Sequence, residues 1–226
     1  HLRDDERVVE NAGCEDLHME AVEAYWQERR RERPGFAQVP QARAYELLHV
    51  LQDGKPTLAA LMNFGIYPQG FFAQFCITAV VVPGTEIGET DENNARFLDN
   101  KRMDGTLSEM LSEALAFCRR NMKTQVSIDR KTGARHDRTE YPVAAIREAV
   151  LNALIHRDYS RYTEGRPIQI YMFADRLEIH SPGSLYGRMT IGQLGKTQLE
   201  LRNPALAVMA ETLTEAEIRN SGIPTM

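Results

Sequence analysis

The chain has 226 residues, of which 42% are hydrophobic and 26% are charged. This balance supports a packed core and excludes an intrinsically disordered protein. The formal net charge of -5 excludes a protein whose whole surface binds nucleic acid, but it is compatible with a local basic patch.

The sequence also limits the compartment and the covalent chemistry. No apolar run approaches the ~18 residues that a membrane-spanning helix needs, so we expect no membrane partner. The three cysteines form no CxxC pair, which argues against a zinc ribbon or a disulfide scaffold and favours the cytoplasm. The chain begins with His1-Leu2-Arg3-Asp4 instead of Met, and we therefore expect a fragment of a longer protein.

The N-terminal part predicts helices followed by one buried strand. Residues 1–40 have the composition of helical or linker sequence, and residues 41–52 predict a helix. The apolar segment 57–64 fits a helix or a strand equally well, whereas 75–82 predicts a buried strand. The polar residues 84–104 predict a loop.

The middle of the chain predicts one helix and one hairpin. Thr106 and Glu109 have the spacing of a capping box, and the apolar stripe after them predicts a helix that ends near Asn121. Residues 125–129 and 135–140 flank a glycine-containing turn and predict a β-hairpin.

Tyr141-Pro142 begins the most informative helix, which runs to His156. One face of this helix is expected to pack on the core: Ile146, Ala149, Val150, Ala153 and Leu154. The opposite face carries a polar column at four-residue intervals, Glu148, Asn152 and His156, with Leu151 and Ile155 among them. Because a fully solvated face would not need those two apolar residues, we predict that this face lines a cleft.

The polar column suits nucleotide chemistry. A carboxylate such as Glu148 can take a proton from an attacking water, and the amide oxygen of Asn152 is a hard ligand for Mg²⁺. Mg²⁺ often combines one or two such oxygens with substrate phosphates. The alternative is a polar helix face with internal hydrogen bonds and no ligand.

The sequence His156-Arg157-Asp158 has the letters of a protein-kinase catalytic loop. That loop requires an Asn five residues after its Asp, but Thr163 stands there. No glycine-rich loop with the kinase lysine strand precedes it, so we exclude a kinase.

A β-hairpin over residues 168–180 follows, and it ends in the small-residue turn 181–184. Residues 184–202 are punctuated by glycines and predict a mobile lid beside the cleft. Lys196 and Arg202 in this stretch are candidates for contacts with phosphates, with ordinary surface charge as the alternative.

Several motifs occur in an order that resembles one bacterial family. They are Tyr141-Pro142, residues 146–160, residues 175–179, Ser181-Pro182-Gly183, Arg202-Asn203-Pro204 and Ser221-Gly222-Ile223-Pro224. In these motifs the chain is similar to transcriptional regulators that carry an AlbA/Schlafen-type DNA-binding domain and are labelled RecG-related helicases. The C-terminal region of that family resembles the GHKL ATPases, the group of gyrase, heat-shock-ninety, histidine kinase and MutL. No GxxxxGK[ST] loop supports the helicase label.

The resemblance implies roles for individual residues. Glu148 would be the base that activates water, Asn152 the Mg²⁺ ligand, and His156 its basic neighbour. The turn with Ser181 and Gly183 would stand at the first glycine box, and Gly222 would belong to the second. ATP and Mg²⁺ are therefore the implied cofactors.

Three positions depart from the GHKL pattern. Ser181 stands where those ATPases have an Asp that recognises the adenine amino group, and Pro182 removes a backbone donor. Asn220 stands where the family commonly has Gly. Because a site without its base-reading carboxylate loses discrimination, we expect weak or altered ATP binding.

We therefore expect an α+β fold in which residues 124–226 form a GHKL-like α/β sandwich and residues 1–123 form an α/β connecting region. The leading hypothesis is a regulatory nucleotide-binding-like domain of a transcriptional regulator with weak or no ATP hydrolysis. DNA would bind to a domain absent from this sequence. The alternatives are a non-enzymatic, homodimerising scaffold with a vestigial cleft, and an active Mg²⁺-dependent ATPase.

Overall fold

A four-stranded mixed sheet in the order β4-β3-β7-β8 organises the α+β fold. Its strands are β3 (Ile77–Val81), β4 (Asp99–Met103), β7 (Ile168–Met172) and β8 (Leu177–His180). Strand β3 pairs antiparallel with β4 and parallel with β7, and β7 and β8 form an antiparallel hairpin. This computed structural model describes residues 3–128, 135–184 and 201–220.

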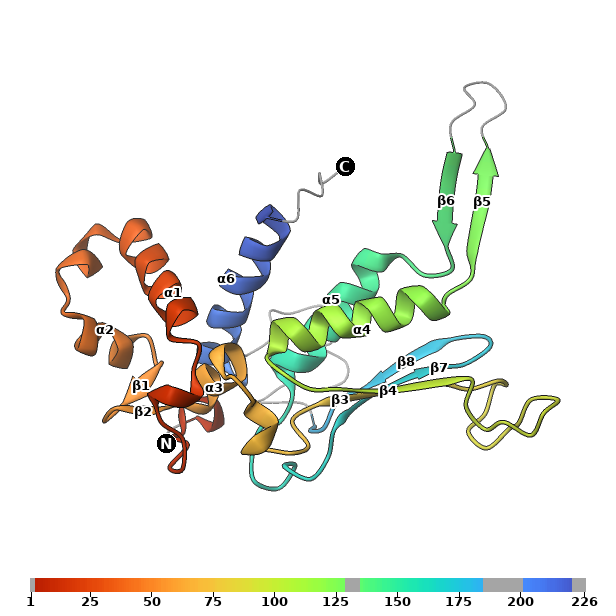
Figure 1. The fold of residues 1–226 in the computed structure, drawn as a ribbon, viewed down its shortest axis with the longest axis horizontal. Helices are drawn as coiled ribbons and strands as arrows, with labels where there is room; N and C mark the ends of the chain where they lie inside the picture. The colour runs from red at the N-terminus through yellow and green to blue at the C-terminus, as the bar shows by residue number, and fades with distance from the viewer. Residues whose placement is uncertain (1–2, 129–134, 185–200, 221–226) are drawn as a thin grey trace.

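Two helices, α4 (Leu107–Asn121) and α5 (Val143–His156), lie on one face of the sheet (Figure 1). The strands alternate accordingly, and the buried residues Ile77, Ala79, Ile168 and Ile170 face these helices. The predicted capping box begins α4, because Thr106 Oγ1 accepts the Glu109 N–H and Glu109 accepts the Thr106 N–H. The predicted helix at 143–156 is also present.

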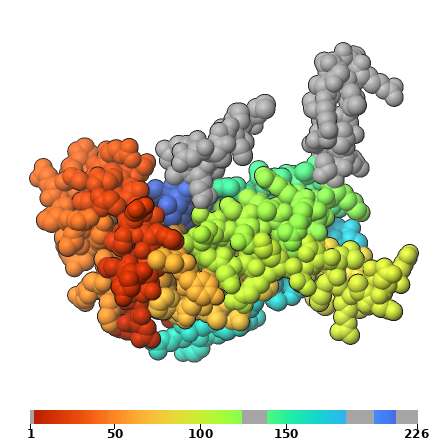
Figure 2. Space-filling model, in the orientation of Figure 1, coloured from red at the N-terminus to blue at the C-terminus, as the bar shows by residue number. Residues whose placement is uncertain are grey.

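The N-terminal segments form a helical layer beside the sheet. It contains α1 (Met19–Glu32), α2 (Gln41–Leu47), α3 (Leu58–Phe64), the short strands β1 (Leu51–Gln52) and β2 (Lys55–Pro56), and the 3-10 turns η1 (Asp4–Glu6), η2 (Cys14–Asp16), η3 (Pro34–Gln38) and η4 (Pro68–Gly70). Every residue of α3 is buried, and this helix packs against α6 (Pro204–Asn220). One hydrophobic core runs from Val9 to Ala210, and Figure 2 shows the N-terminal segments packed against the α4 layer.

The hairpin predicted before α5 is present as β5 (Thr124–Ile128) and β6 (Arg135–Thr139). It extends away from the rest of the chain in Figure 1. Its connecting turn lies outside the described residues.

Two expectations of secondary structure need correction, and one open assignment is resolved. The predicted loop 84–104 contains strand β4, whose inward-facing Asp99 and Lys101 pair with Arg120 and Glu113 of α4. Ion pairs thus replace the apolar pattern that marks a strand. The ambiguous segment 57–64 is helix α3, capped by Thr57.

The second correction concerns a helix length. The helix expected over 41–52 ends at Leu47, because the chain turns through a left-handed His49 into β1.

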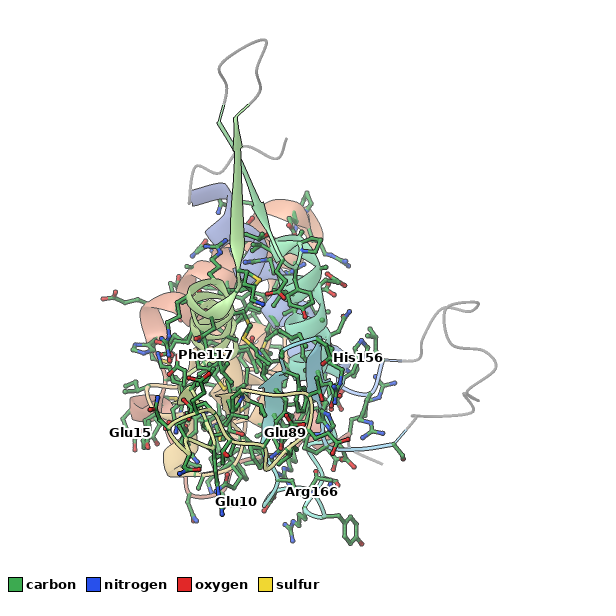
Figure 3. All side chains as sticks on the ribbon, turned by 90° about the vertical axis from the view of Figure 1, so that its right-hand side faces the viewer. Glu10, Glu15, Glu89, Phe117, His156 and Arg166 are labelled. Atoms are coloured by element: carbon green, nitrogen blue, oxygen red, sulfur yellow. The ribbon has the colours of Figure 1, made fainter. Side chains whose placement is uncertain are left out.

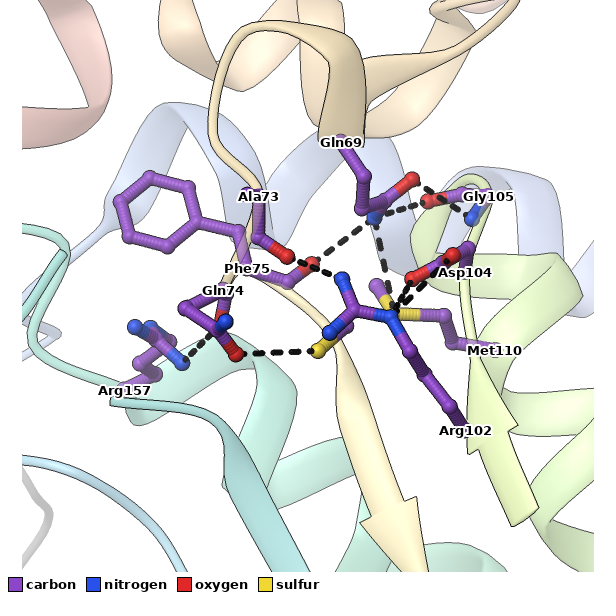
Figure 4. A network of polar contacts seen from close by, with 10 residues as sticks. Gln69, Ala73, Gln74, Phe75, Arg102, Asp104, Gly105, Met110 and Arg157 are labelled. Carbon is purple, nitrogen blue, oxygen red and sulfur yellow. Dashed lines mark hydrogen bonds and ion pairs between the residues drawn. The ribbon is translucent and has the colours of Figure 1, made fainter. Parts of the chain in front are cut away.

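A buried amide joins the chain before β3 to the chain after β4, at one end of this antiparallel pair (Figure 4). Gln69 Nε2 donates to the carbonyls of Phe75 at 2.8 Å and Gly105 at 2.9 Å. Gln69 Oε1 accepts the Gly105 N–H at 2.7 Å. The 3-10 turn η4 is therefore fixed to the start of β3 and to the turn before α4.

Within the described residues, no helix has both the length and the apolar composition needed to span a membrane.

Candidate functional site

The polar column of α5 consists of Glu148 and Asn152, which are joined by a hydrogen bond, and of His156. Asn152 Nδ2 donates to Glu148 Oε1 at 3.0 Å, and both side chains are exposed. His156 is half-buried and lies near the end of α5, on the right of the molecule in Figure 3. On the other face, Ile146 and Val150 are buried in the core.

Two apolar residues of α5 differ from the prediction. Ala149 is exposed although it was expected in the core, and Ile155 is buried although it was expected beside the column. Near the C-terminal end of α5 the buried face therefore includes Ile155, because α6 also packs on α5 there.

A hollow of about 380 Å³ lies between the end of α5 and the turn after β8. Its lining consists of Asn152, Ala153, His156, Ser181, Pro182, Gly183 and Ser184. Glu148 does not line the hollow and is joined to it through Asn152. The volume falls within the ~300–1,000 Å³ of small-ligand sites, so the hollow has room for a nucleotide-sized group.

The turn 181–184 is tied to α5 by two hydrogen bonds. Ser181 Oγ donates to the Ala153 carbonyl at 3.0 Å, and the Asp158 N–H donates to the Pro182 carbonyl at 2.9 Å. Gly183 has a left-handed φ of 123°, and a Cβ there would lie 2.6 Å from Arg202 Nη1. Only glycine lets the backbone approach the hollow this closely.

Arg202 lies under this turn and does not line the hollow. Its Nη1 is 3.3 Å from Asp158 Oδ2, and its Nη2 donates to the Ser184 carbonyl at 2.7 Å. The buried guanidinium therefore joins the end of α5 to the turn. Its positive charge lies directly behind Gly183.

Asn203 completes the junction between α5 and α6. Its fully buried Nδ2 donates to the carbonyls of Ile155 at 2.8 Å and Arg157 at 2.7 Å. These carbonyls lie in the last turn of α5 and at its C-cap, where helices have no intrahelical partners for them. Asn203 therefore ends α5 and fixes the position of His156.

Buried aromatic and cationic groups support the same helix end from behind. Arg157 lies over the ring of Phe75 with 4.5 Å to the centroid, and its Nη2 donates to the Thr163 carbonyl at 3.0 Å. The Tyr159 hydroxyl donates to the Leu154 carbonyl at 2.8 Å. Burial raises the pKa of Tyr159, so the phenol stays protonated as the donor.

The surroundings of His156 shift its pKa. Burial is the main cause that lowers the pKa of His156, and the positive charge of Arg202 lowers it further, while Glu211 opposes both. The imidazole is therefore held in its neutral form, in which one ring nitrogen accepts a hydrogen bond.

The donor set around the hollow is oxygen-rich rather than metal-chelating. Among the described residues, no three His, Cys, Asp or Glu side chains gather in a metal-binding cluster. Asn152 beside the hollow still fits Mg²⁺ in the manner of a phosphate-bridged ion, which needs few protein ligands.

Other site predictions fall outside the described part of the chain. They are Lys196, Gly222 and residues 185–200 of the proposed lid. Conversely, Asp158 and Asn203 have roles at the site that the sequence pattern did not predict. Both adjoin the end of the key helix or the start of the next, where short polar side chains often satisfy helix ends.

Comparisons with known proteins support an ATPase-like region. Residues 165–226 match an ATPase-like family model described as "Putative ATP-dependent DNA helicase recG C-terminal". The structure resembles the crystal structure of the DIP2311 protein from Corynebacterium diphtheriae, with a TM-score of 0.63 and 20% sequence identity. That similarity covers 95% of this chain but only 40% of the other, so the chain spans less than half of the solved protein. No curated protein matches the sequence.

Proposed function

We propose that the hollow binds the phosphates of a nucleotide together with Mg²⁺, and that the chain is a regulatory nucleotide-binding-like domain with weak or no hydrolysis. One observation carries this proposal. Asn152, His156 and Gly183, which come from two separate segments, border a single hollow, and Glu148 is hydrogen-bonded to Asn152. The match of residues 165–226 to an ATPase-like family adds support.

The side chains of the hollow have complementary tasks in this proposal. The Asn152 amide oxygen would hold Mg²⁺, and the backbone at Gly183 allows close approach of a phosphate. The charge of Arg202 behind the turn favours an anion in front of it. When bound, the metal ion would neutralise phosphate charge.

Recognition of the base is expected to be weak. Ser181 donates its hydroxyl hydrogen to Ala153, so it can offer a ligand only its acceptor lone pairs. No carboxylate lines the hollow among the described residues. We therefore propose that the phosphates dominate binding and that adenine and guanine nucleotides bind with similar affinities.

Slow hydrolysis follows from the position of the candidate base. Glu148 is exposed and one of its oxygens accepts a hydrogen bond from Asn152. A general base must lie within hydrogen-bond reach of the attacking water, and Glu148 stands outside the lining.

Isothermal titration calorimetry with ATP, GTP and Mg²⁺ tests the proposal. Binding should weaken by about tenfold, the equivalent of ~1.4 kcal/mol, in Asn152→Ala. Asn100→Ala, at an exposed position of β4, serves as a matched control with unchanged affinity. No heat at millimolar nucleotide would contradict the proposal and leave the non-enzymatic scaffold, whereas turnover lost in Glu148→Gln with binding retained would instead establish an active ATPase.

We also propose that the domain belongs to a bacterial transcriptional regulator whose sequence-specific DNA contacts lie outside these 226 residues. The greater length of the solved structural relative supports a larger architecture. Footprinting of the full-length protein, with and without nucleotide, tests this proposal, and a footprint reproduced in full by this chain alone would contradict it.

A further inference from the structure

The loop between α5 and β7 has a fixed conformation. Thr163 Oγ1 donates to the Asp158 carbonyl at 2.6 Å, and the Thr163 carbonyl accepts the guanidinium of Arg157 at 3.0 Å and the N–H of Arg166 at 3.1 Å. Thr163 itself is buried. The side chains that point outward from this loop are therefore presented on a rigid support.

Tyr162 is the most conspicuous of these side chains, because 96% of its surface is exposed. A tyrosine ring of this exposure contributes almost no burial to folding. Arg161 and Arg166 on the same loop are also exposed, and neither guanidinium has a hydrogen-bond or ion-pair partner among the described residues. Figure 3 shows Arg166 at the lower margin of the molecule.

The charge of this loop is positive. Its two carboxylates are paired outside the loop, Glu164 with Arg7 at 2.8 Å and Asp158 with Arg202 at 3.3 Å, so neither neutralises Arg161 or Arg166. The loop is therefore a local basic patch on a chain whose net charge is -5.

A second hollow, of about 300 Å³, is lined in part by Arg166. Its lining consists of Gly165, Arg166, Pro167, Gln169, His180, Ser181 and Pro182. Gln169 and His180 are cross-strand partners on β7 and β8, so an amide and an imidazole stand side by side in it. It shares Ser181 and Pro182 with the first hollow but has its own guanidinium, amide and imidazole.

These groups match the chemistry of an unpaired nucleotide strand. An exposed aromatic ring stacks on a base, arginines contact the phosphates, and amide or imidazole groups reach a base edge. Duplex DNA does not suit Tyr162, because its bases are already stacked. A protein partner suits it poorly too, since the residues around Tyr162 are polar and offer no apolar surround.

We propose that the loop with Arg161, Tyr162 and Arg166, together with the second hollow, binds single-stranded nucleic acid with little sequence preference. The site adjoins the nucleotide hollow at Ser181 and Pro182, and it requires neither ATP nor Mg²⁺. It supplies a sequence-tolerant contact in addition to the DNA recognition proposed above.

Fluorescence anisotropy with the 226-residue chain and a labelled oligothymidylate of about 12 nucleotides tests this site in the absence of nucleotide. Tyr162→Ala should weaken binding by about tenfold, and Tyr162→Trp should retain it, because stacking is the lost interaction. Arg161→Ala combined with Arg166→Ala should reduce the slope of log affinity against log salt by about 1.4, at about 0.7 per phosphate contact.

Two variants control for exposure and charge alone. Tyr67→Ala removes another exposed tyrosine, at 56% exposure, and Arg33→Ala removes an exposed arginine remote from the loop. Both should bind as the parent does. The proposal is overturned if no binding is detected at about 50 mM salt, if the control variants lose as much affinity, or if a duplex binds as tightly as the single strand. Displacement by an acidic peptide that depends on Tyr162 would likewise overturn it and assign the loop to a protein partner.

Discussion

Asp158 and Arg202 form an ion pair under Gly183, with 3.3 Å between Asp158 Oδ2 and Arg202 Nη1. The pair joins the end of α5 to the start of α6, and the same guanidinium holds the Ser184 carbonyl. One buried cation thus sets the spacing between the two walls of the nucleotide hollow.

Replacing Arg202 should therefore cost both stability and ligand affinity. Arg202→Met leaves the Asp158 carboxylate without its partner and should lower the free energy of unfolding by about 3 kcal/mol. Urea denaturation measures this loss. Arg43→Met removes an exposed ion pair with Glu46 and should cost less than about 1 kcal/mol, so equal losses in the two variants would contradict a special role for Arg202.

Gly183 should not tolerate a side chain. Gly183→Ala combines a left-handed φ of 123° with a Cβ 2.6 Å from Arg202 Nη1 and 2.8 Å from Asp158 Cβ. We expect a loss of about 1–3 kcal/mol in the free energy of unfolding, measured by thermal denaturation. Gly165→Ala is the matched control, because nothing lies within 4 Å of its Cβ position and its stability should be unchanged.

Asn203 should be required for the end of α5. In Asn203→Ala the carbonyls of Ile155 and Arg157 lose their buried donor, which should cost about 1–3 kcal/mol. Hydrogen exchange should show faster opening of the last turn of α5. Unchanged exchange there would mean that water or a neighbouring group replaces the amide.

The stability of the fold should depend on His156 below neutral pH. Because burial and the charge of Arg202 lower the pKa of His156 in the folded state, the unfolded chain binds the proton more tightly. Stability should thus be intact above the ordinary histidine pKa of ~6.5 and fall as the pH drops from there toward the lowered value. Thermal unfolding between about pH 7.5 and 5 should show this slope, and His156→Gln should flatten it.

A bound phosphate should reverse the direction of this shift. Negative charge in the hollow favours the imidazolium, so nucleotide should raise the pKa of His156. Titration of the histidine signals by NMR, with and without nucleotide, measures the change. An equal shift of every histidine signal would show an unspecific effect.

The local elements of the site could be predicted because their signals are local. Proline at the start of α5, the capping box of α4 and the alternation in β7 each lie within a few residues. Strand β4 could not be predicted, since its inward-facing Asp99 and Lys101 are satisfied by α4, which follows later in the chain. The hydropathy pattern of β4 does not reveal these ion pairs with α4.

The candidate site likewise contains residues whose positions could be predicted from the sequence and residues whose positions could not. The spacing of Glu148, Asn152 and His156 places them on one face of a helix, so their alignment could be predicted. The buried pairing of Arg202 with Asp158 joins positions 44 residues apart, and no local pattern marks it. The exposure of Tyr162 depends on the loop conformation set by Thr163, and it was also invisible in the sequence.

The parallel pairing of β3 with β7 has a practical consequence for dissecting this chain. A shortened protein that starts after α4 would lack both β3 and β4. Strand β7 would then be an edge strand of a two-stranded sheet with β8. Its unsatisfied backbone groups would then be open to intermolecular strand addition. A chain that starts between α4 and β5 should therefore aggregate, whereas the 226-residue chain should stay dispersed.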